Sequence, residues 1–264
     1  MASLLITNDD GVDAPALVPL ARAMKRFGEV VIAAPDKERS WIGKAISRVD
    51  MVEATKLERD GLEMWAVDGF PADCVHVGAY GMLDDLPDLV VSGINIGANK
   101  GSAFATGSGT LGAAVEASNI GTPGIAFSAM SAGNWFEWSQ WVRTEAALEM
   151  WSRLADIAAD IVAVVLEAGL PPGVDVLSVN MPPDANVDTP RVVTSLARTR
   201  YGSIFSGSNG LYRHNFDGIL HTDGDDLAGS DLATLDAGHV SITPIRMATT
   251  MSLPDGFRQA LERQ

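Results

Sequence analysis

The feature that most constrains the fold is a strand–helix–strand pattern at the start of the sequence. A short apolar run at residues 3–8 precedes a helical apolar stripe at residues 16–27, and a second apolar run follows at residues 29–34. Short apolar runs of this kind are typical of strands buried on both faces. Two consecutive strands joined by a helix lie parallel in one sheet. We therefore expect an α/β fold with helices on both faces of a mostly parallel sheet.

The same patterns predict further elements along the chain. Two extended segments are expected within residues 44–67, with a turn at Asp60-Gly61. Ser208-Asn209-Gly210 predicts a hairpin turn, because Asn-Gly suits the positive φ angles of a type I′ turn. Further strands are predicted at 88–92, 122–128, 174–180 and 239–245, and helices at 71–82, 110–119 and 139–168, with a short helix closing the chain.

These elements indicate three parts of the chain. Residues 1–185 are predicted to form the sheet-and-helix core, and residues 186–235 a projecting β arm. Residues 236–264 are predicted to supply a strand and a helix that return to the core or to a neighbouring subunit. The arm is predicted because residues 190–225 are rich in Gly, Ser and Asn and have no helical period.

Composition excludes two classes of partner. The 264 residues carry a net charge of −15, so we expect no binding to a nucleic-acid polymer or to a membrane surface. The predicted helix at 139–168 contains several charged residues and therefore does not fit a membrane span.

The start of the chain lacks the pattern of a signal peptide, and Cys74 is the only cysteine. A cytoplasmic location is the expectation that follows.

Oxygen-bearing side chains gather where the predicted strands end. In an open parallel sheet the ligand site lies outside the carboxyl ends of the strands. Carboxylate, amide and hydroxyl oxygens suit Mg²⁺ or Mn²⁺ better than zinc. Adjacent carboxylates also repel each other, which a cation relieves. The candidates are Asn8, Asp9 and Asp10 after the first strand, Asp36, Glu38, Arg39 and Ser40 after the second, and Ser92, Asn95 and Asn99 after the strand at 88–92.

A fourth segment, Thr106-Gly-Ser-Gly-Thr110, directly precedes a predicted helix. Its small residues let backbone N–H groups approach an anion, and the helix N-terminus adds positive potential. Ser108 and Thr110 could add hydroxyl donors. Each motif also has a simpler interpretation: Asn-Asp-Asp-Gly as a turn, Gly93–Gly101 as a flexible loop, and Ser108 as a helix N-cap.

Other polar and aromatic residues have weaker assignments. Arg39 and Lys44 are either phosphate contacts or solvated surface charges. Trp41 adjoins Ser40 and is therefore a candidate for stacking on an aromatic substrate. The scattered histidines receive no catalytic role: His76, His214, His221 and His239. The closely spaced tryptophans are expected to pack in the core or to cover the sheet: Trp135, Trp138 and Trp141.

Taken together, the motifs resemble the SurE family of survival-protein nucleotidases. The matching segments keep the family's order: TNDDGVDAP, APDKERSWIGKAIS, VDGFPADCV, PDLVVSGINIGAN, SGTLGAAVEA and HVSITPI. They cover most of the first 130 residues and a patch near the C-terminus. The departures lie around the candidate site, at Ile42, Gly43 and Lys44, at Phe70, and at Lys100 with the following SAFATG.

The resemblance implies a metal-dependent phosphomonoesterase that acts on nucleoside 5′- and 3′-monophosphates. It implies a Rossmann-like, doubly wound core with a projecting β-hairpin arm that exchanges between subunits of a homodimer or homotetramer. One divalent cation, Mg²⁺ or Mn²⁺, would be held in each subunit by Asp9, Asp10, Ser40 and Asn95. Asp9 and Asp10 would also be catalytic, and the phosphate pocket would be lined by Asn8, Asn99, Ser108, Gly109 and Thr110.

Three other functions compete with this interpretation. A phosphatase with an aspartate nucleophile is disfavoured, because that chemistry uses carboxylates two residues apart, whereas Asp9 and Asp10 are adjacent. A nucleotide-binding sensor without turnover is the main alternative, since the departures surround the site. An oligomer built through the arm around a vestigial site is the third.

Overall fold

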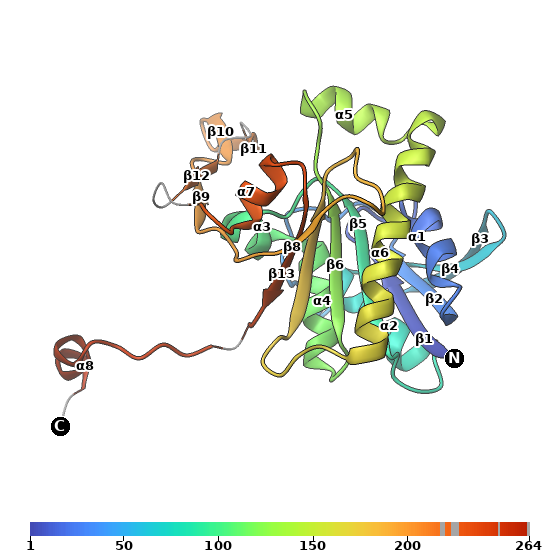
Figure 1. Cartoon of the computed structure of the whole chain (residues 1–264), viewed down its shortest axis with the longest axis horizontal. Helices are drawn as coiled ribbons and strands as arrows, with labels where there is room; N and C mark the ends of the chain where they lie inside the picture. The colour runs from blue at the N-terminus through green and yellow to red at the C-terminus, as the bar shows by residue number, and fades with distance from the viewer. Residues whose placement is uncertain (217–219, 223–226, 248, 263–264) are drawn as a thin grey trace.

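The computed structural model describes residues 1–216, 220–222, 227–247 and 249–262, and within them a nine-stranded sheet forms the centre of the molecule (Figure 1). The strands lie in the order β3-β4-β2-β1-β5-β6-β7-β13-β8. The run from β4 to β7 is parallel throughout, whereas β3 and β13 are antiparallel to β4 and β7. Their bounds are β1 Ala2–Thr7, β2 Gly28–Pro35, β3 Ala54–Arg59, β4 Leu62–Val67, β5 Leu89–Ile96, β6 Gly124–Ala129, β7 Val176–Met181, β8 Arg191–Val193 and β13 Val240–Ile245.

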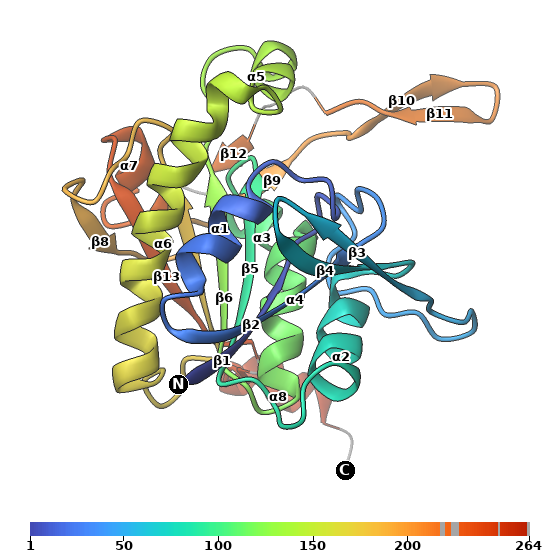
Figure 2. The same cartoon turned by 90° about the vertical axis from the view of Figure 1, so that its right-hand side faces the viewer.

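Helices cover both faces of this sheet (Figure 2). α1 (Leu17–Met24) and α6 (Leu148–Ala168) pack on one face, and α2 (Pro71–Gly81) and α4 (Gly109–Asn119) on the other. Strand β1 shows why the apolar runs are continuous. Its Leu4 and Ile6 enter the core under α1 and α6, whereas Leu5 between them enters the core under α2 and α4. The predicted doubly wound, mostly parallel α/β fold is confirmed.

The predicted single helix at 139–168 is wrong, because the chain forms two helices there. α5 (Trp135–Trp141) and a short 3₁₀ turn (Glu145–Ala147) precede α6. At the break, the Trp151 indole N–H donates to the Val142 carbonyl, at 2.9 Å, and the Thr144 hydroxyl donates to the Trp141 carbonyl. These contacts satisfy carbonyls that a continuous helix would bond internally, so the chain turns.

A second difference is α3 (Gly101–Gly107), a helix that the sequence patterns do not predict. Its sequence, GSAFATG, is too rich in small residues to show an apolar stripe. The buried carboxylate of Asp231 accepts the Gly101 N–H at 2.6 Å and the Ala197 N–H at 2.9 Å. The start of this helix is therefore fixed by a residue 130 positions away.

The predicted β arm is present, and its hairpin projects from the body in Figure 2. β10 (Phe205–Ser208) and β11 (Leu211–His214) pair around Asn209 and Gly210, whose φ angles of 55° and 80° fit the predicted type I′ turn. β9 (Thr199–Tyr201) and β12 (Leu220–Thr222) form the base of the arm. The projecting part is shorter than 186–235, because β8 joins the main sheet and α7 (Asp231–Asp236) packs against β13.

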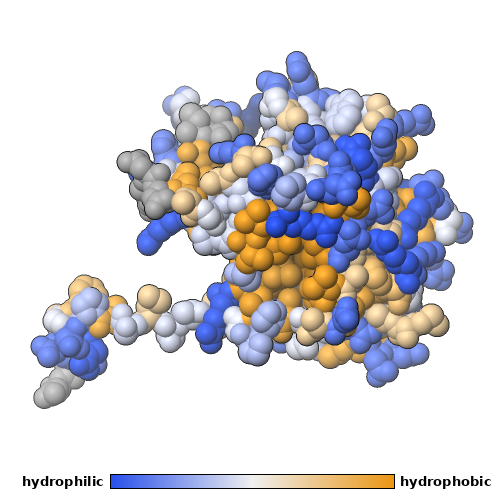
Figure 3. Space-filling view, viewed as in Figure 1, coloured by the Kyte–Doolittle hydropathy of each residue, from blue (hydrophilic) through white to orange (hydrophobic). Residues whose placement is uncertain are grey.

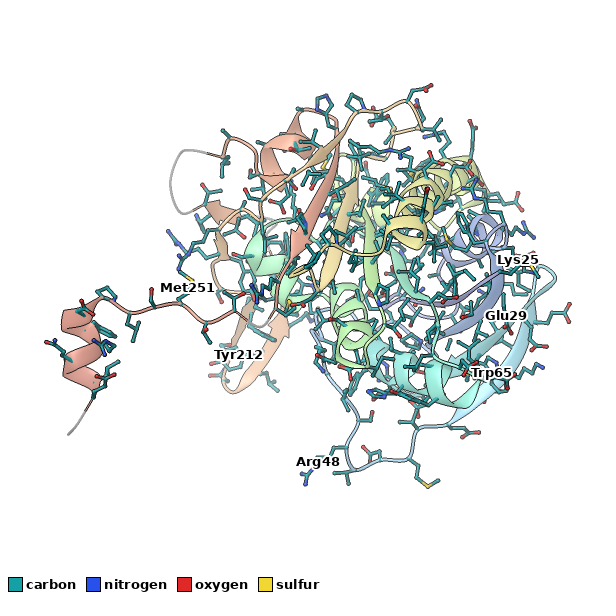
Figure 4. All side chains as sticks on the ribbon, turned by 60° about the horizontal axis from the view of Figure 1, so that its bottom comes forward. Lys25, Glu29, Arg48, Trp65, Tyr212 and Met251 are labelled. Carbon is teal, nitrogen blue, oxygen red and sulfur yellow. The ribbon has the colours of Figure 1, made fainter. Side chains whose placement is uncertain are left out.

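After β13 the chain leaves the body of the molecule (Figures 1 and 4). Met251 lies on this tail, and α8 (Asp255–Leu261) buries none of its described residues. Figure 3 shows an apolar area on the body, in the part of the view where β7 and β13 lie. Among the described residues, no helix has both the length and the apolar character that a membrane span needs.

Candidate active site

The candidate residues meet at the carboxyl ends of β1 and β5. β2 lies on one side of β1 and β5 on the other, so the strand order reverses at this point of the sheet. Asp10, three residues beyond β1, accepts the Ile96 N–H at the end of β5 through Oδ2, at 2.9 Å. Sites for ligands occur at such reversal points, because the loops from the two strands diverge there.

Asn8 holds the turn that presents the two carboxylates. Its amide nitrogen donates to the Gly11 carbonyl, and its amide oxygen accepts the Gly11 N–H, both at 3.0 Å. Gly11 has a φ of 93°, which favours glycine. Both polar atoms of the predicted phosphate contact Asn8 are therefore used within the loop.

Asp9 is buried against the N-terminus of α4. Its Oδ1 accepts a hydrogen bond of 2.5 Å from the hydroxyl of Thr110, which is fully buried. Gly109 makes this approach possible, because a Cβ at this position would lie 2.7 Å from the Cβ of Asp9 and 2.9 Å from its Oδ2. Both residues were predicted to line a phosphate pocket, and the structure places both beside Asp9.

Burial raises the pKa of both carboxyl groups. The pKa of Asp9 rises to about 6, because desolvation outweighs its hydrogen bond from Thr110. The pKa of Asp10 rises to about 8, because desolvation is joined by repulsion from Asp9. Glu38 raises both values further, whereas Arg143 lowers that of Asp10. The loops thus concentrate negative charge that the surrounding protein does not offset.

The loop after β2 lies against the first loop. The backbone N–H of Arg39 donates to the backbone carbonyl of Asp9 at 2.7 Å, which brings the predicted ligand Ser40 to the site. The Ser40 hydroxyl is exposed and donates to Glu38 Oε1 at 2.8 Å. Glu38 in turn lies 3.8 Å from a guanidinium nitrogen of Arg143. Arg143 could not be identified from the sequence, because it lies in the turn between α5 and α6, far along the chain from any strand end.

Asn95 is the predicted ligand from β5. The pairing of β5 with β6 changes register between Ser92 and Asn95, an irregularity of the kind that redirects a side chain. Gly93 lies inside it, and a Cβ there would be 2.2 Å from the Phe127 carbonyl oxygen. The Asn95 amide nitrogen donates to the Gly97 carbonyl at 2.6 Å, which orients the side chain.

Two predicted phosphate contacts are engaged inside the protein. Asn99 is buried, and its amide nitrogen donates to the Ser128 hydroxyl at 2.8 Å while its N–H donates to the Asn180 side chain at 2.7 Å. Ser108 is the N-cap of α4 and accepts the Leu111 N–H at 3.0 Å. The simpler N-cap interpretation is therefore confirmed for Ser108.

The two cations near the site have acidic partners. Arg39 pairs with Asp36 at 3.0 Å and with Asp68 at 2.9 Å, and Lys44 pairs with Glu116. Glu116 also lies 2.6 Å from the ring of His76. Both cations are thus paired with acidic side chains in this arrangement.

The three tryptophans of α5, predicted to pack in the core or to cover the sheet, differ in burial. Trp138 is buried, but Trp135 is 55% exposed and Trp141 41% exposed. Trp135 lies beside Gly97, next to the loop that carries Asn95. The helix α5 therefore lies at the rim of the site rather than wholly against the sheet.

Comparison with known proteins identifies the family. The sequence profile described as "Survival protein SurE" matches residues 4–203, which include every candidate site residue. The chain belongs to the SurE family. This membership confirms the resemblance that the sequence motifs carry.

The relatives of this SurE chain cover almost its whole length. It is 39% identical to the 5′-nucleotidase SurE of Methanocella arvoryzae, over 94% of this chain and 92% of the relative. It is 38% identical to the 5′-nucleotidase SurE of Geotalea daltonii, over 94% of both chains. The SurE protein of Aquifex aeolicus has a similar crystal structure, with 30% identity, 94% of each chain covered and a TM-score of 0.73. The fold of this chain is therefore that of a solved SurE protein.

The SurE site fits a hard divalent cation better than a transition metal bound by nitrogen or sulfur. Among the described residues, no group of three or more His, Cys, Asp and Glu could hold a metal. The predicted set contains only two such residues, Asp9 and Asp10, and otherwise offers the oxygens of Ser40 and Asn95. Two buried carboxylates with raised pKa values and a third nearby are the environment that a cation stabilises.

Proposed function

We propose that this protein is a metal-dependent phosphomonoesterase that hydrolyses nucleoside 5′-monophosphates, and 3′-monophosphates as well. The observation that carries the proposal is the buried pair Asp9 and Asp10, set against the N-terminus of α4 at the reversal point of the sheet. The relatives named 5′-nucleotidase supply the substrate class.

The cation of this proposal is Mg²⁺ or Mn²⁺, one in each subunit, held by Asp9, Asp10, Ser40 and Asn95. When bound, it supplies charge neutralisation on the phosphate and lowers the pKa of the attacking water. The protein's own contribution is to hold the carboxylates still. Thr110 fixes one oxygen of Asp9 and the Ile96 N–H fixes one oxygen of Asp10, so each carboxylate keeps a second oxygen for the cation or for water.

The remaining groups orient the substrate and move a proton. The Gly109 N–H lies in the first turn of α4, where backbone donors have no partner within the helix, whereas the Thr110 N–H already donates toward the Asp9 carboxylate. We assign the Gly109 N–H to a phosphate oxygen, with Thr110 holding the Asp9 carboxylate beside it. The water oxygen bonds to phosphorus as the phosphorus–oxygen bond to the nucleoside breaks, and Asp9 or Asp10 accepts the proton of the water. The leaving nucleoside oxygen takes up a proton from solvent, so nucleoside and phosphate are released.

Phosphate release from a panel of nucleoside 5′- and 3′-monophosphates tests this function. The protein is assayed with Mg²⁺, with Mn²⁺ and with EDTA, and Asp9→Asn is the matched variant. We expect release only with a metal, and a loss of roughly a thousandfold in Asp9→Asn, since a charge that stabilises the transition state is removed. Tight nucleotide binding without release under any metal would refute the enzyme and favour the sensor.

We also propose that the chain forms a homodimer or homotetramer and works in the cytoplasm. Two features support an assembly: the apolar area over β7 and β13, and the exposed tail that carries Met251, Leu253 and Phe257. Exposed apolar surface of this extent commonly marks a protein contact. Light scattering coupled to gel filtration measures the mass, and a monomer at micromolar concentration would refute the assembly.

A further inference from the structure

Five aromatic side chains gather where the arm meets the loop that follows Ser40. We call them the aromatic cluster. The ring of Trp41 is the centre of the group, with four neighbours whose centroids lie between 4.9 and 5.7 Å from its own. The members are Trp41 from the site loop, Phe104 from α3, and Tyr201, His214 and Phe216 from the arm.

This cluster differs from the aromatic core of the protein in its exposure. Trp151 and Phe127 are fully buried, as expected of rings that only stabilise the fold. In contrast, Trp41 and His214 are exposed and the other three members are only partly buried. Five rings therefore lie in contact while each keeps surface open to solvent. Exposed aromatic surface is what a planar ligand stacks on.

The backbone places Trp41 beside the predicted phosphate loop. Trp41 directly follows Ser40 and has a φ of 61°, a left-handed conformation that is unusual for a bulky residue. Two residues on, the Gly43 N–H donates to the Gly107 carbonyl at 2.9 Å. The six-membered ring of Trp41 lies 3.8 Å from the position of a Cβ on Gly107, the residue immediately before Ser108. The strained residue thus lies next to the N-terminus of α4.

The arm is less acidic than the rest of the protein. Residues 199–222, from β9 to β12, contain two arginines and one aspartate, in a chain with a net charge of −15. A segment of this charge repels the phosphate of a nucleotide less than the acidic body does.

We propose that the aromatic cluster binds the base of the nucleoside monophosphate, so that Tyr201 and Phe216 of the arm belong to the substrate site of the same chain. This inference rests on the proposed function, because it takes the phosphate to lie at Gly109. One sugar joins the base to the phosphate, so the base must lie close to that loop. Trp41 is the ring of the cluster that contacts both the loop and the arm.

The alternative is that the cluster only fastens the arm to the core. Two substrates separate these roles: adenosine 5′-monophosphate, and ribose 5-phosphate, which has the same sugar and phosphate without the base. The main variant is Trp41→Gly, because glycine adopts the left-handed backbone without strain. Trp41→Phe keeps a ring at the same place. The control is Tyr212→Ala, which removes an exposed ring from the same hairpin outside the cluster (Figure 4).

We expect Trp41→Gly to lower kcat/KM for adenosine 5′-monophosphate about tenfold more than for ribose 5-phosphate, the effect of losing one stacked base. Trp41→Phe should recover most of this difference, and Tyr212→Ala should leave the ratio of the two substrates within about twofold of the original. If Trp41→Gly lowers kcat/KM equally for both substrates, the inference is overturned and the cluster only fastens the arm. If Trp41→Gly lowers kcat/KM for neither substrate, the inference is overturned as well.

A binding measurement keeps this test separate from the proposed function. Calorimetry with adenosine, which has no phosphate, needs neither metal nor turnover. We expect the original protein to bind adenosine and Trp41→Gly to bind it at least about tenfold more weakly. If the protein releases no phosphate yet shows this difference, the enzyme fails and the base site stands. If adenosine binds both proteins equally, or neither, the base site fails.

Discussion

Replacing Asp9 with asparagine should stabilise the metal-free protein at neutral pH, although it removes activity. The Asp9 carboxyl has a pKa of about 6 in the folded protein, against 3.8 for an unperturbed aspartate. Between these values the folded state holds a proton that the unfolded state has released. Because the unfolded state binds fewer protons, the free energy of unfolding falls as the pH rises from about 4 through about 6.

The magnitude follows from this difference in proton affinity. Each factor of ten corresponds to 1.36 kcal/mol, so the ionised Asp9 costs about 3 kcal/mol of stability at pH 7 and above, and about 1 kcal/mol at pH 4.5. No discount for solvent screening applies, since only 3% of Asp9 is exposed. Asparagine carries no charge at either pH, and its side-chain oxygen can still accept the Thr110 hydroxyl.

Urea unfolding in EDTA at pH 7.5 and at pH 4.5 measures this effect. We expect Asp9→Asn to exceed the original protein by about 3 kcal/mol at pH 7.5 and by about 1 kcal/mol at pH 4.5. Adding Mn²⁺ at pH 7.5 should stabilise the original protein and leave the variant unchanged. Asp85→Asn, at an exposed position, is the control for loss of one negative charge. Equal stability of variant and original at pH 7.5 would refute the electrostatic account of the site.

Three further substitutions test the surroundings of Asp9. Gly109→Ala should lower kcat/KM at least tenfold and lower the free energy of unfolding in urea by about 1–3 kcal/mol, because the new Cβ meets Asp9. In the control Gly81→Ala the new Cβ meets nothing within 4 Å, so kcat/KM and stability should stay unchanged. Thr110→Val should raise the pKa of Asp9 further and weaken the binding of Mn²⁺ measured by calorimetry. An unchanged affinity for Mn²⁺ would contradict this role of Thr110. Ser108→Ala should lose about 1 kcal/mol of stability as an N-cap, and an unaltered unfolding midpoint would contradict that role.

The parts of the fold that follow from local sequence were predicted. β1 and β2 are runs of residues buried on both faces, and the type I′ turn at Asn209-Gly210 is encoded by two residues. The segments that were missed depend on distant residues. α3 begins where Asp231 accepts the Gly101 N–H, and α6 begins after a turn that Trp151 fastens. Neither contact leaves a pattern within the segment itself.

For the site, the position of the loops was predictable but the direction of each side chain was not. Strand ends identified Asp9 and Asp10, which the structure places together. The same reasoning could not show that the side chains of Asn8 and Asn99 form hydrogen bonds inside the protein. Asn8 bonds to Gly11, and Asn99 bonds to residues of β6 and β7. The roles of the SurE site residues in metal and phosphate binding stay predictions.

The opposed demands of stability and chemistry explain the arrangement around Asp9. Two adjacent carboxylates in a dry site repel each other, and Glu38 adds to the repulsion, so the metal-free loop is destabilised. The same charges would give a divalent cation its affinity. Gly109 lets the N-terminus of α4 approach Asp9, so backbone donors for an anion would lie next to the proposed cation. Trp41 lies against Gly107 in a left-handed backbone conformation that is strained for a bulky residue. The proposed cation, phosphate and base sites would then be neighbours, as hydrolysis of a nucleotide by this strongly acidic protein would require.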